Sequence, residues 1–426
     1  MRGKLIALAM ILASSGLAVI APPAQAQAVP SENLKLDKKR IDAALGAMIA
    51  DGRAAGVSAL IWQDGREVYF GTAGMADREA KRPMRRNTIA QIYSMTKPVT
   101  GVALMQLWEA GKFRLDDPLA RYLPEYADMR VYAGKDAAGQ PRTVPAERPI
   151  TVRDIMRHTA GFAYGAGPTP AHDAYVAAEP LSLTIPLAEA SKRLARVPLL
   201  YQPGTQWEYS IAVDVQAALV EKLSGQRFAD YVRTHIFEPL KMSDTAWRQP
   251  DARLPRFAAM NAKVDGKLTQ QGAATARKLN FEDHALTPGG FGLASTLDDY
   301  QRFARMLLNK GELDGARILK PSTVKLMATD QLDPAIKERA WLPGKGAVGF
   351  GFNFAVRKAP PQTPQENRGA VGEFFWDGMA STLFWVDPAN RLTAVFFVQT
   401  IPYDGTLHRD FRGAVYGADY KGPAGD

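Results

Sequence analysis

Helical spacing of apolar residues marks the first element that the sequence predicts. In segment 36–52 apolar residues recur every three or four positions, from Ile41 to Ile49, which is typical of an amphipathic helix. The next segment, 57–70, contains two apolar runs separated by Asp64-Gly65, a pair that favours a two-residue hairpin turn. A helix followed by a hairpin indicates that the chain opens with an antiparallel sheet and helices packed on it.

The stretch from Val99 to Trp108 is apolar on too many sides for a surface helix. It predicts a helix that is buried on most sides and ends near Gly111. Pro98 indicates where this helix starts, because proline lacks an N–H and only the first helical turn tolerates that loss. We therefore expect the helix to begin almost at Ser94, at the positive end of its dipole.

Residues 115–285 are predicted to be helical with long irregular connections. A capping pattern from Thr151 to Asp154 starts a short helix, and a longer one is expected at about 210–223. Segment 162–182 is rich in Gly, Pro and Ala and is predicted to be a loop. These features favour an inserted all-α domain.

Strand patterns return after Pro288-Gly289-Gly290. Thr296 is predicted to cap a helix that ends at Gly311, and a last helix is expected near 407–420. Between them lie strand-like runs at 349–356, 369–376, 382–386 and 392–400.

Sheet-forming segments thus occur at both ends of the chain. We expect an α/β (α+β) fold in which residues 30–114 and 286–426 form one discontinuous domain, with an antiparallel sheet flanked by helices, and residues 115–285 form the helical domain. A site is expected in the cleft between the two.

Residues 1–26 resemble a secretory signal peptide, with basic Arg2 and Lys4, an apolar run and an Ala24-Gln25-Ala26 cleavage site. The apolar run is interrupted and short for a membrane span. The sequence contains no cysteine, so neither lipidation nor disulfides are expected. We predict an exported protein, periplasmic or secreted, without stable membrane insertion after cleavage.

The formal net charge of +9 does not by itself indicate a nucleic-acid partner. Basic runs such as Lys38-Lys39-Arg40 lack the interleaved aromatic residues of nucleic-acid-binding surfaces. A solvated basic face explains them better.

Ser94 and Lys97 are the first candidates for catalysis, because residues three apart share one helix face. Burial penalises the ammonium and lowers the pKa of Lys97, so its amine could take the Ser94 proton near neutral pH. The S-x-x-K pattern alone is weak evidence, since it also occurs as a solvated pair at a helix start.

Other hydrolytic sites find little support. No serine has glycine at both −2 and +2, as the nucleophile elbow of α/β-hydrolases requires. Of the five histidines, His158 lies in the most patterned setting, and a structural role at a helix end suits it better than catalysis. Paired histidines at metal spacing are absent, so no metal is predicted.

Two further stretches support Ser94. The turn 201–210 presents Tyr209 at the start of a helix, where its hydroxyl could face the cleft. The apolar run 372–379 ends in Gly378-Met379, where the backbone could approach a ligand closely.

Together these stretches resemble the serine β-lactamase/penicillin-binding superfamily, and most closely the β-lactamase-like (family VIII) carboxylesterases. The resemblance covers nearly the whole mature chain and implies a β-lactamase/transpeptidase-like fold. Its motifs are Ser-Met-Thr-Lys at 94–97, His-Thr-Ala-Gly at 158–161, Pro-Gly-Thr at 203–205 leading to Tyr209, the glycine-rich segment 290–296 and Phe-Trp-Val-Asp-Pro at 384–388.

The resemblance implies a two-step acyl transfer without a cofactor. Ser94 would attack the carbonyl while Lys97 and Tyr209 share the general-base work, and Tyr209 would protonate the leaving group. A lysine ammonium beside Tyr209 is expected to favour its phenolate. The backbone N–H groups of Ser94 and Met379 would hold the oxyanion, and water would release the acyl group.

Two departures from the β-lactamase pattern bear on the substrate. Trp376-Asp377-Gly378 replaces Lys-Thr-Gly, so the cation that meets a substrate carboxylate is missing, and family VIII usually carries Trp-Gly-Gly here. Ile211 replaces the asparagine of Tyr-x-Asn. We expect these four residues to contact the substrate and to disfavour an anionic one. The sequence leaves open whether Asp377 faces the cleft.

The preferred hypothesis is a secreted serine hydrolase that cleaves small carboxylic esters. A β-lactamase, a D-alanyl or D-amino-acid peptidase, or an amidase using the same site remains an alternative. A non-catalytic binding protein is a third hypothesis, which intact Ser94, Lys97 and Tyr209 disfavour. The expected partner is a small ester or amide, and oligomeric state is not predicted.

Overall fold

The computed structural model describes residues 34–139, 141–165, 167–340, 342–420 and 422. The predicted signal peptide, residues 1–26, lies outside the described residues. The central element is an eight-stranded sheet in which every neighbouring pair is antiparallel, in the order β12-β13-β14-β15-β16-β1-β2-β3. Its strands are β1 (Gly56–Gln63), β2 (Arg66–Asp77), β3 (Arg82–Pro83), β12 (Val348–Phe350), β13 (Ala355–Arg357), β14 (Phe374–Asp377), β15 (Leu383–Asp387) and β16 (Leu392–Val398).

The two ends of the chain meet in this sheet, because β1 pairs with β16 on one side and with β2 on the other. The β1–β2 turn is the predicted Asp64-Gly65 turn, with φ of +53° and +76°. These positive values suit the two-residue hairpin turn that matches the twist of the strands. The predicted antiparallel sheet shared by both ends of the chain is confirmed.

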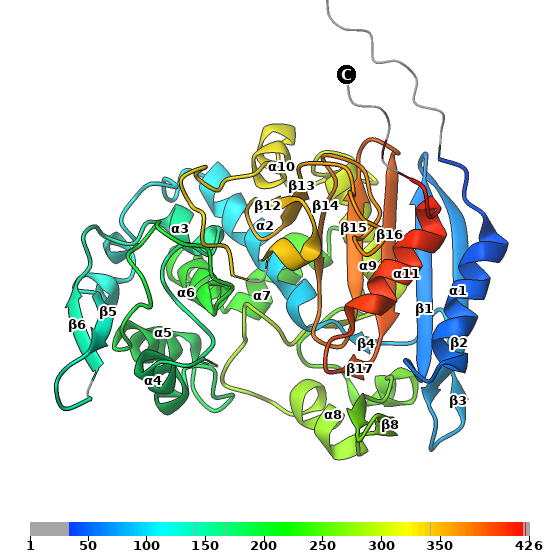
Figure 1. The fold of residues 1–426 in the computed structure, drawn as a ribbon, viewed down its shortest axis with the longest axis horizontal. Helices are drawn as coiled ribbons and strands as arrows, with labels where there is room; N and C mark the ends of the chain where they lie inside the picture. Colours follow the sequence, from blue (N-terminus) through cyan, green and yellow to red (C-terminus); the bar gives the residue numbers. More distant parts are fainter. Residues whose placement is uncertain (1–33, 140, 166, 341, 421, 423–426) are drawn as a thin grey trace, which may run out of the picture.

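Helices cover both faces of the sheet (Figure 1). α1 (Lys38–Ala50) and α11 (Gly405–Tyr416) lie on one face, and α9 (Leu297–Leu308) lies on the other. Neighbouring residues of β15 show the alternation, because the Trp385 ring packs 5.5 Å from Phe411 of α11 and the Phe384 ring packs 5.0 Å from Tyr300 of α9. Covered faces explain why all residues of β14, β15 and β16 are buried.

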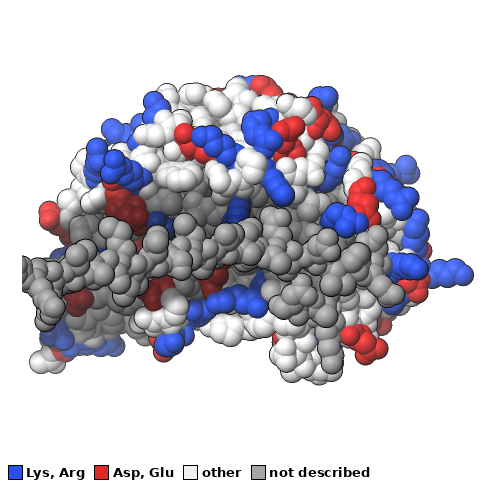
Figure 2. Space-filling view, turned by 90° about the horizontal axis from the view of Figure 1, so that it is seen from above, with Lys and Arg blue, Asp and Glu red and all other residues white. Residues whose placement is uncertain are grey.

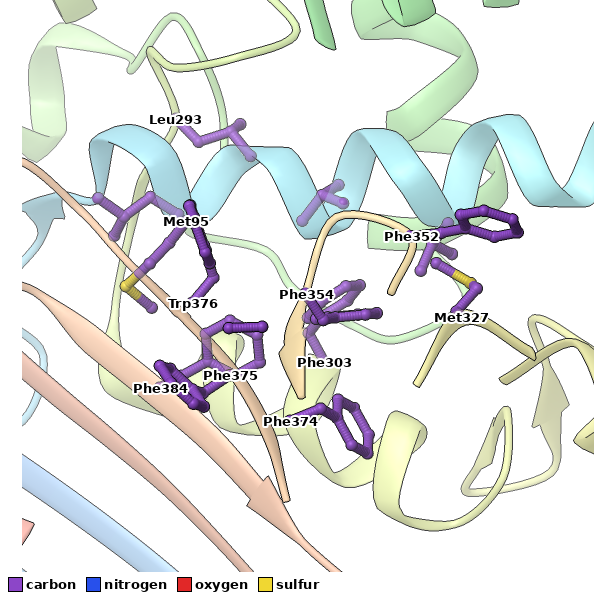
Figure 3. Close-up of a cluster of buried hydrophobic side chains, with 14 of the residues drawn as sticks. Met95, Leu293, Phe303, Met327, Phe352, Phe354, Phe374, Phe375, Trp376 and Phe384 are labelled. Atoms are coloured by element: carbon purple, nitrogen blue, oxygen red, sulfur yellow. The ribbon is translucent and has the colours of Figure 1, made fainter. Parts of the chain in front are cut away.

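The core beneath the site lies between the sheet and α2 (Thr96–Glu109), the predicted buried helix. Figure 3 shows side chains of β14 and β15, including Phe375, Trp376 and Phe384, gathered below this helix. α2 follows a 3-10 turn, η1 (Tyr93–Met95), and ends just before Gly111, as the sequence indicates. Thr296 caps α9 as predicted by accepting from the Asp299 N–H.

The middle of the chain is mainly helical, but the all-α expectation is wrong. Its helices are α3 (Val152–Met156), α4 (Pro170–Ala178), α5 (Leu187–Ala195), α6 (Ala212–Ser224), α7 (Phe228–Val232) with the π-turn η4 (Arg233–Phe237), and α8 (Ala273–Phe281). It also contains two strand pairs, β5 (Arg130–Lys135) with β6 (Pro141–Pro145) and β7 (Asn261–Val264) with β8 (Lys267–Gln270).

A turn signal could have revealed one of these pairs. Asp265-Gly266, with φ of +48° and +74°, joins β7 to β8 in the same way as Asp64-Gly65 joins the first hairpin. β7 also pairs with β17 (Thr400–Ile401), so backbone strand pairing connects the middle segment to the C-terminal part of the chain.

Two other predictions need correction. Segment 162–182 is not wholly a loop, because Thr169 and Pro170 start α4. The run 349–356 is the β12–β13 hairpin rather than one strand, since Asn353 turns the chain with φ of +63°.

The remaining elements are short. They are β4 (Ala90–Gln91), which pairs with β9 (Ala294–Ser295), β10 (Glu312–Leu313), which pairs with β11 (Ala316–Arg317), α10 (Pro321–Met327), and the 3-10 turns η2 (Leu119–Arg121), η3 (Pro124–Tyr126), η5 (Asp251–Arg256) and η6 (Leu342–Lys345). The β4–β9 pair brings the glycine-rich segment 290–296 beside the start of α2.

The visible part of the surface in Figure 2 places Lys and Arg side chains among Asp and Glu side chains rather than in one continuous basic area. Among the described residues, every helix falls short of the length and apolar character that crossing a membrane requires.

Candidate active site

Ser94 lies in η1, immediately before the first turn of α2. The preceding residue, Tyr93, has φ of +43°, a conformation that costs free energy for a residue with a bulky side chain. The turn is held from α9, because the Tyr300 hydroxyl donates to the Met95 carbonyl over 2.7 Å. Ser94 itself is half-buried and lines a cavity.

Lys97 is almost fully buried, with 1% of its surface exposed. Its Nζ lies 3.2 Å from Ser94 Oγ and donates to the Gly290 carbonyl over 2.7 Å. Burial lowers the pKa of Lys97, and the negative charges of Asp214 and Asp377 partly oppose that shift. The structure therefore places an amine that deprotonates more easily than an exposed lysine beside a serine hydroxyl.

Asp214 of α6 is a site residue that the sequence did not single out. Its Oδ1 accepts the backbone N–H groups of Gly289 (2.9 Å) and Gly290 (3.2 Å). Its Oδ2 is buried without a hydrogen-bond partner among the described residues. Burial raises the pKa of Asp214, and the nearby Lys97 opposes that rise.

Gly290 is the point at which these groups converge. A Cβ atom there would lie 2.9 Å from Asp214 Oδ2, 3.3 Å from Lys97 Nζ and 3.3 Å from the Tyr164 hydroxyl. A side chain would displace the lysine or the carboxylate, so the close approach of the backbone requires glycine.

Tyr209 precedes α6, and its ring lies 4.5 Å from Lys97 Nζ. Trp376 Nε1 donates to the Tyr209 hydroxyl over 3.4 Å. Burial raises the pKa of Tyr209 above its usual range, and hydrogen bonds with Ser94 and Trp376 only partly offset this. The direction of this shift favours the protonated phenol over the phenolate that the resemblance implies.

His158 packs beneath Tyr209, with the two ring centroids 5.0 Å apart. It adopts φ of +58° after the end of α3, and its Nδ1 lies 3.1 Å from Ser210 Oγ. Burial lowers its pKa well below the usual value, so the imidazole is neutral. His158 thus supports the Tyr209 turn from below.

The end of β14 lies against the nucleophile turn. A Cβ atom on Gly378 would lie 2.4 Å from the Ile92 carbonyl oxygen, so only glycine allows this approach. Met379 follows, and both it and Ser94 line the cavity. Their N–H groups are the predicted oxyanion donors, and the close packing at Gly378 is the feature that would hold them together.

The cavity above Ser94 has a volume of about 740 Å³. Its described lining combines aromatic residues with the ends of β14 and η6, and consists of Tyr93, Ser94, Tyr164, Tyr209, Gly290, Phe291, Gly344, Lys345, Asp377, Gly378, Met379 and Tyr403. The aromatic lining from Tyr93, Tyr164, Phe291 and Tyr403 was not predicted. Phe291 lies in the glycine-rich motif 290–296, but the sequence assigned no role to its side chain.

The four predicted substrate contacts divide into two pairs. Asp377 and Gly378 line the cavity. Trp376 and Ile211 are each 1% exposed and are not part of the cavity lining. Ile211 lines a different pocket. Trp376 supports Tyr209 from behind rather than facing the cavity.

The orientation of Asp377 is now clear. Its carboxylate forms a buried ion pair with Lys345, a residue of η6 that the sequence gave no reason to notice. The Tyr403 hydroxyl donates to the same Asp377 oxygen over 3.5 Å.

Comparison with known proteins identifies the family. The sequence model of the Beta-lactamase family matches residues 41–416. The chain belongs to the Beta-lactamase family. It is 33% identical to protein Rv1367c of Mycobacterium tuberculosis, over 82% of this chain and 87% of that one. It is 30% identical to esterase EstB of Burkholderia gladioli, over 88% of this chain and 94% of that one.

A solved hydrolase structure shares this fold. EstCE1, described as a hydrolase with promiscuous acyltransferase activity, superposes with a TM-score of 0.72 at 27% identity, over 89% of this chain and 98% of that one. The predicted resemblance to β-lactamase-like enzymes with esterase relatives is confirmed, as is the antiparallel sheet flanked by helices.

Proposed function

We propose that this Beta-lactamase family protein is a serine carboxylesterase that cleaves small esters through an acyl-enzyme on Ser94. The observation that carries the proposal is the buried Lys97 amine, whose Nζ lies 3.2 Å from Ser94 Oγ in the floor of an aromatic cavity. Lysine buried beside a serine is an arrangement that activates the hydroxyl without histidine.

In the acylation step the neutral Lys97 amine takes the Ser94 proton as Oγ attacks the ester carbonyl. The carbonyl oxygen becomes an oxyanion, which the N–H groups of Ser94 and Met379 stabilise. Collapse of this intermediate breaks the bond to the leaving alkoxide, and the protonated Tyr209 gives that alkoxide its proton. Lys97 then returns its proton to Tyr209, which leaves an acyl-Ser94 ester and a neutral base.

In the second step water attacks the acyl-enzyme carbonyl. The Tyr209–Lys97 pair accepts the water proton, and Ser94 leaves with a proton from the same pair. Every step uses the chain's own groups and water, so the proposal includes no cofactor.

The lining of the cavity favours the binding of an uncharged, partly apolar acyl group. Its walls are largely aromatic, and its ionic groups, Lys345 and Asp377, are already paired with each other. A β-lactam or a peptide C-terminus carries a carboxylate, for which this lining offers no uncompensated cation. This charge argument ranks the esterase above the β-lactamase and peptidase alternatives. It does not separate an uncharged ester from an uncharged amide, which the substrate panel distinguishes.

One panel of substrates tests the proposal. Wild type and Ser94→Ala are compared on p-nitrophenyl esters, a chromogenic cephalosporin and D-amino-acid amides. The expected result is ester turnover that Ser94→Ala lowers by at least about a thousandfold. Cephalosporin turnover with a higher kcat/KM than the best ester would replace the esterase with the β-lactamase alternative.

We also propose that residues 1–26 act as a signal peptide that directs export, and that the protein acts in the periplasm or outside the cell. The support is the sequence pattern of that segment. Fractionation of expressing cells tests it, and full-length protein retained in the cytoplasm would contradict it.

A further inference from the structure

The Lys345–Asp377 pair occupies the wall of the cavity rather than the protein surface. The Lys345 side chain is 8% exposed and the Asp377 side chain is 11% exposed. Nζ of Lys345 also lies 5.1 Å from the Trp376 ring and 5.4 Å from the Tyr403 ring. Water is largely excluded around these charges, so each acts more strongly on its surroundings than a surface charge does.

Each member of the pair carries a charge opposite to that of the other. Tyr403 and His408 also lie against Asp377, and His408 Nδ1 is 4.0 Å from the Asp377 carboxylate. Burial lowers the pKa of His408 to about 4, so it carries no charge at neutral pH. Among the described ion pairs, the Asp377 carboxylate is the charge that compensates Lys345.

The negative charge of Asp377 acts electrostatically on Lys97 and Tyr209. It opposes the lowering of the Lys97 pKa and contributes to the raised pKa of Tyr209. A substrate bound to Ser94 lies in the same cavity and experiences the same field.

We propose that the Lys345–Asp377 pair sets the charge selectivity of the cavity. Asp377 cancels the Lys345 ammonium, which makes the cavity selective for uncharged acyl groups. Without the Asp377 carboxylate, Lys345 becomes a recognition group for a carboxylate on the substrate. The inference rests on the proposed esterase function and assigns Lys345, from the η6 turn, a role in specificity.

The test uses three esters of matched length that differ in terminal charge: p-nitrophenyl hexanoate, the mono-p-nitrophenyl ester of adipate, and p-nitrophenyl 6-aminohexanoate. The measured quantity is kcat/KM for each charged ester divided by that for hexanoate, in wild type, Asp377→Asn, Lys345→Met and the double variant. This ratio cancels a general loss of activity, since a merely structural pair would lower all three esters together.

Asp377→Asn is expected to raise the adipate ratio by about tenfold or more. Lys345→Met, which leaves Asp377 uncompensated, is expected to lower the adipate ratio and raise the 6-aminohexanoate ratio. The double variant should return both ratios toward wild type. Added salt should reduce the adipate gain of Asp377→Asn, since ions screen the new attraction.

Unchanged ratios in both single variants would overturn the proposal while leaving the esterase function intact. If Asp377→Asn does not fold, Lys345→Met alone decides, because it predicts opposite changes for the two charged esters. Wild type that hydrolyses none of the three esters, yet turns over another substrate class through Ser94, would overturn the proposed function and this inference with it.

Discussion

Lys97 and Asp214 hold opposite sides of one peptide segment: the Gly290 carbonyl accepts from Lys97 Nζ, and the Gly290 N–H donates to the Asp214 carboxylate. The same glycine thus couples the base to a buried negative charge. Asp214 fixes the position of Gly290, and its charge also favours the ammonium form of Lys97. These two effects can be separated by experiment.

The pH profile should show this coupling. Lys97 acts as a base only when neutral, so kcat/KM should rise with pH through the pKa of Lys97, which burial lowers below that of an exposed lysine. Asp214→Asn removes a charge that favours the ammonium, so the Lys97 pKa should fall and the acidic limb should move to lower pH by about one unit. Steady-state kinetics from about pH 5 to 9 measure the shift. An unmoved limb with reduced kcat would mean that Asp214 only positions Gly290.

Tyr209 and Trp376 should respond differently to substitution. Tyr209→Phe removes the phenol that relays protons, so kcat should fall by about 10²–10⁴-fold. Trp376→Phe removes the indole N–H that donates to that phenol, together with part of a buried ring that does not line the cavity. It should lower kcat by less than about tenfold with KM nearly unchanged. A large rise in KM for Trp376→Phe would instead restore Trp376 as a substrate contact.

The parts of the site that local sequence could predict are those carried by one segment. Ser94 and Lys97 lie within one turn of a helix, so their spacing alone brings them together. Tyr209 was found because aromatic and turn residues mark the start of α6. Asp214 lies only five residues on, yet its role depends on the Gly289-Gly290 backbone, which a distant segment supplies.

The orientation of side chains within the third motif could not be predicted. Successive residues of a strand face opposite sides, so Trp376 and Asp377 cannot both point into the cavity, and the sequence does not say which one does. Asp377 faces Lys345, whose position depends on the path of the η6 turn beside β12. Similarly, the fold's antiparallel sheet followed from apolar runs at both ends. The β5–β6 pair was missed because its strands are mostly exposed or half-buried and lack a long apolar run.

Gly378→Ala should disable the oxyanion site without unfolding the protein. The new Cβ would meet the Ile92 carbonyl, so β14 must move away from the nucleophile turn. Misplacing one oxyanion donor typically costs about 10²–10³-fold in kcat, which ester hydrolysis would measure. Gly46→Ala is the matched control, because a Cβ there meets nothing within 4 Å and the residue lies in α1, far from the cavity lining. Equal activity of both variants would exclude this backbone contact from catalysis.

A buried charge cluster behind β14 should matter for stability rather than for chemistry. Glu373 accepts from Arg357 Nε and from Arg412 Nη1, each over 2.9 Å, and all three side chains are 0% exposed. Glu373→Gln keeps the side-chain size but leaves two buried guanidinium groups without their shared carboxylate. Breaking a buried ion pair on one side typically costs about 3–5 kcal/mol, so the free energy of unfolding should fall by roughly that amount.

Denaturant unfolding of Glu373→Gln measures this loss, and Glu238→Gln is the control. Glu238 pairs with Arg233 at the surface, where both side chains are more than half exposed, so its loss should cost less than about 1 kcal/mol. At a temperature where Glu373→Gln remains folded, its kcat for esters should equal that of wild type, because none of the three cluster residues lines the cavity. Reduced kcat with unchanged unfolding free energy would contradict this assignment and link the cluster to the position of Asp377 and Gly378 at the end of the same strand.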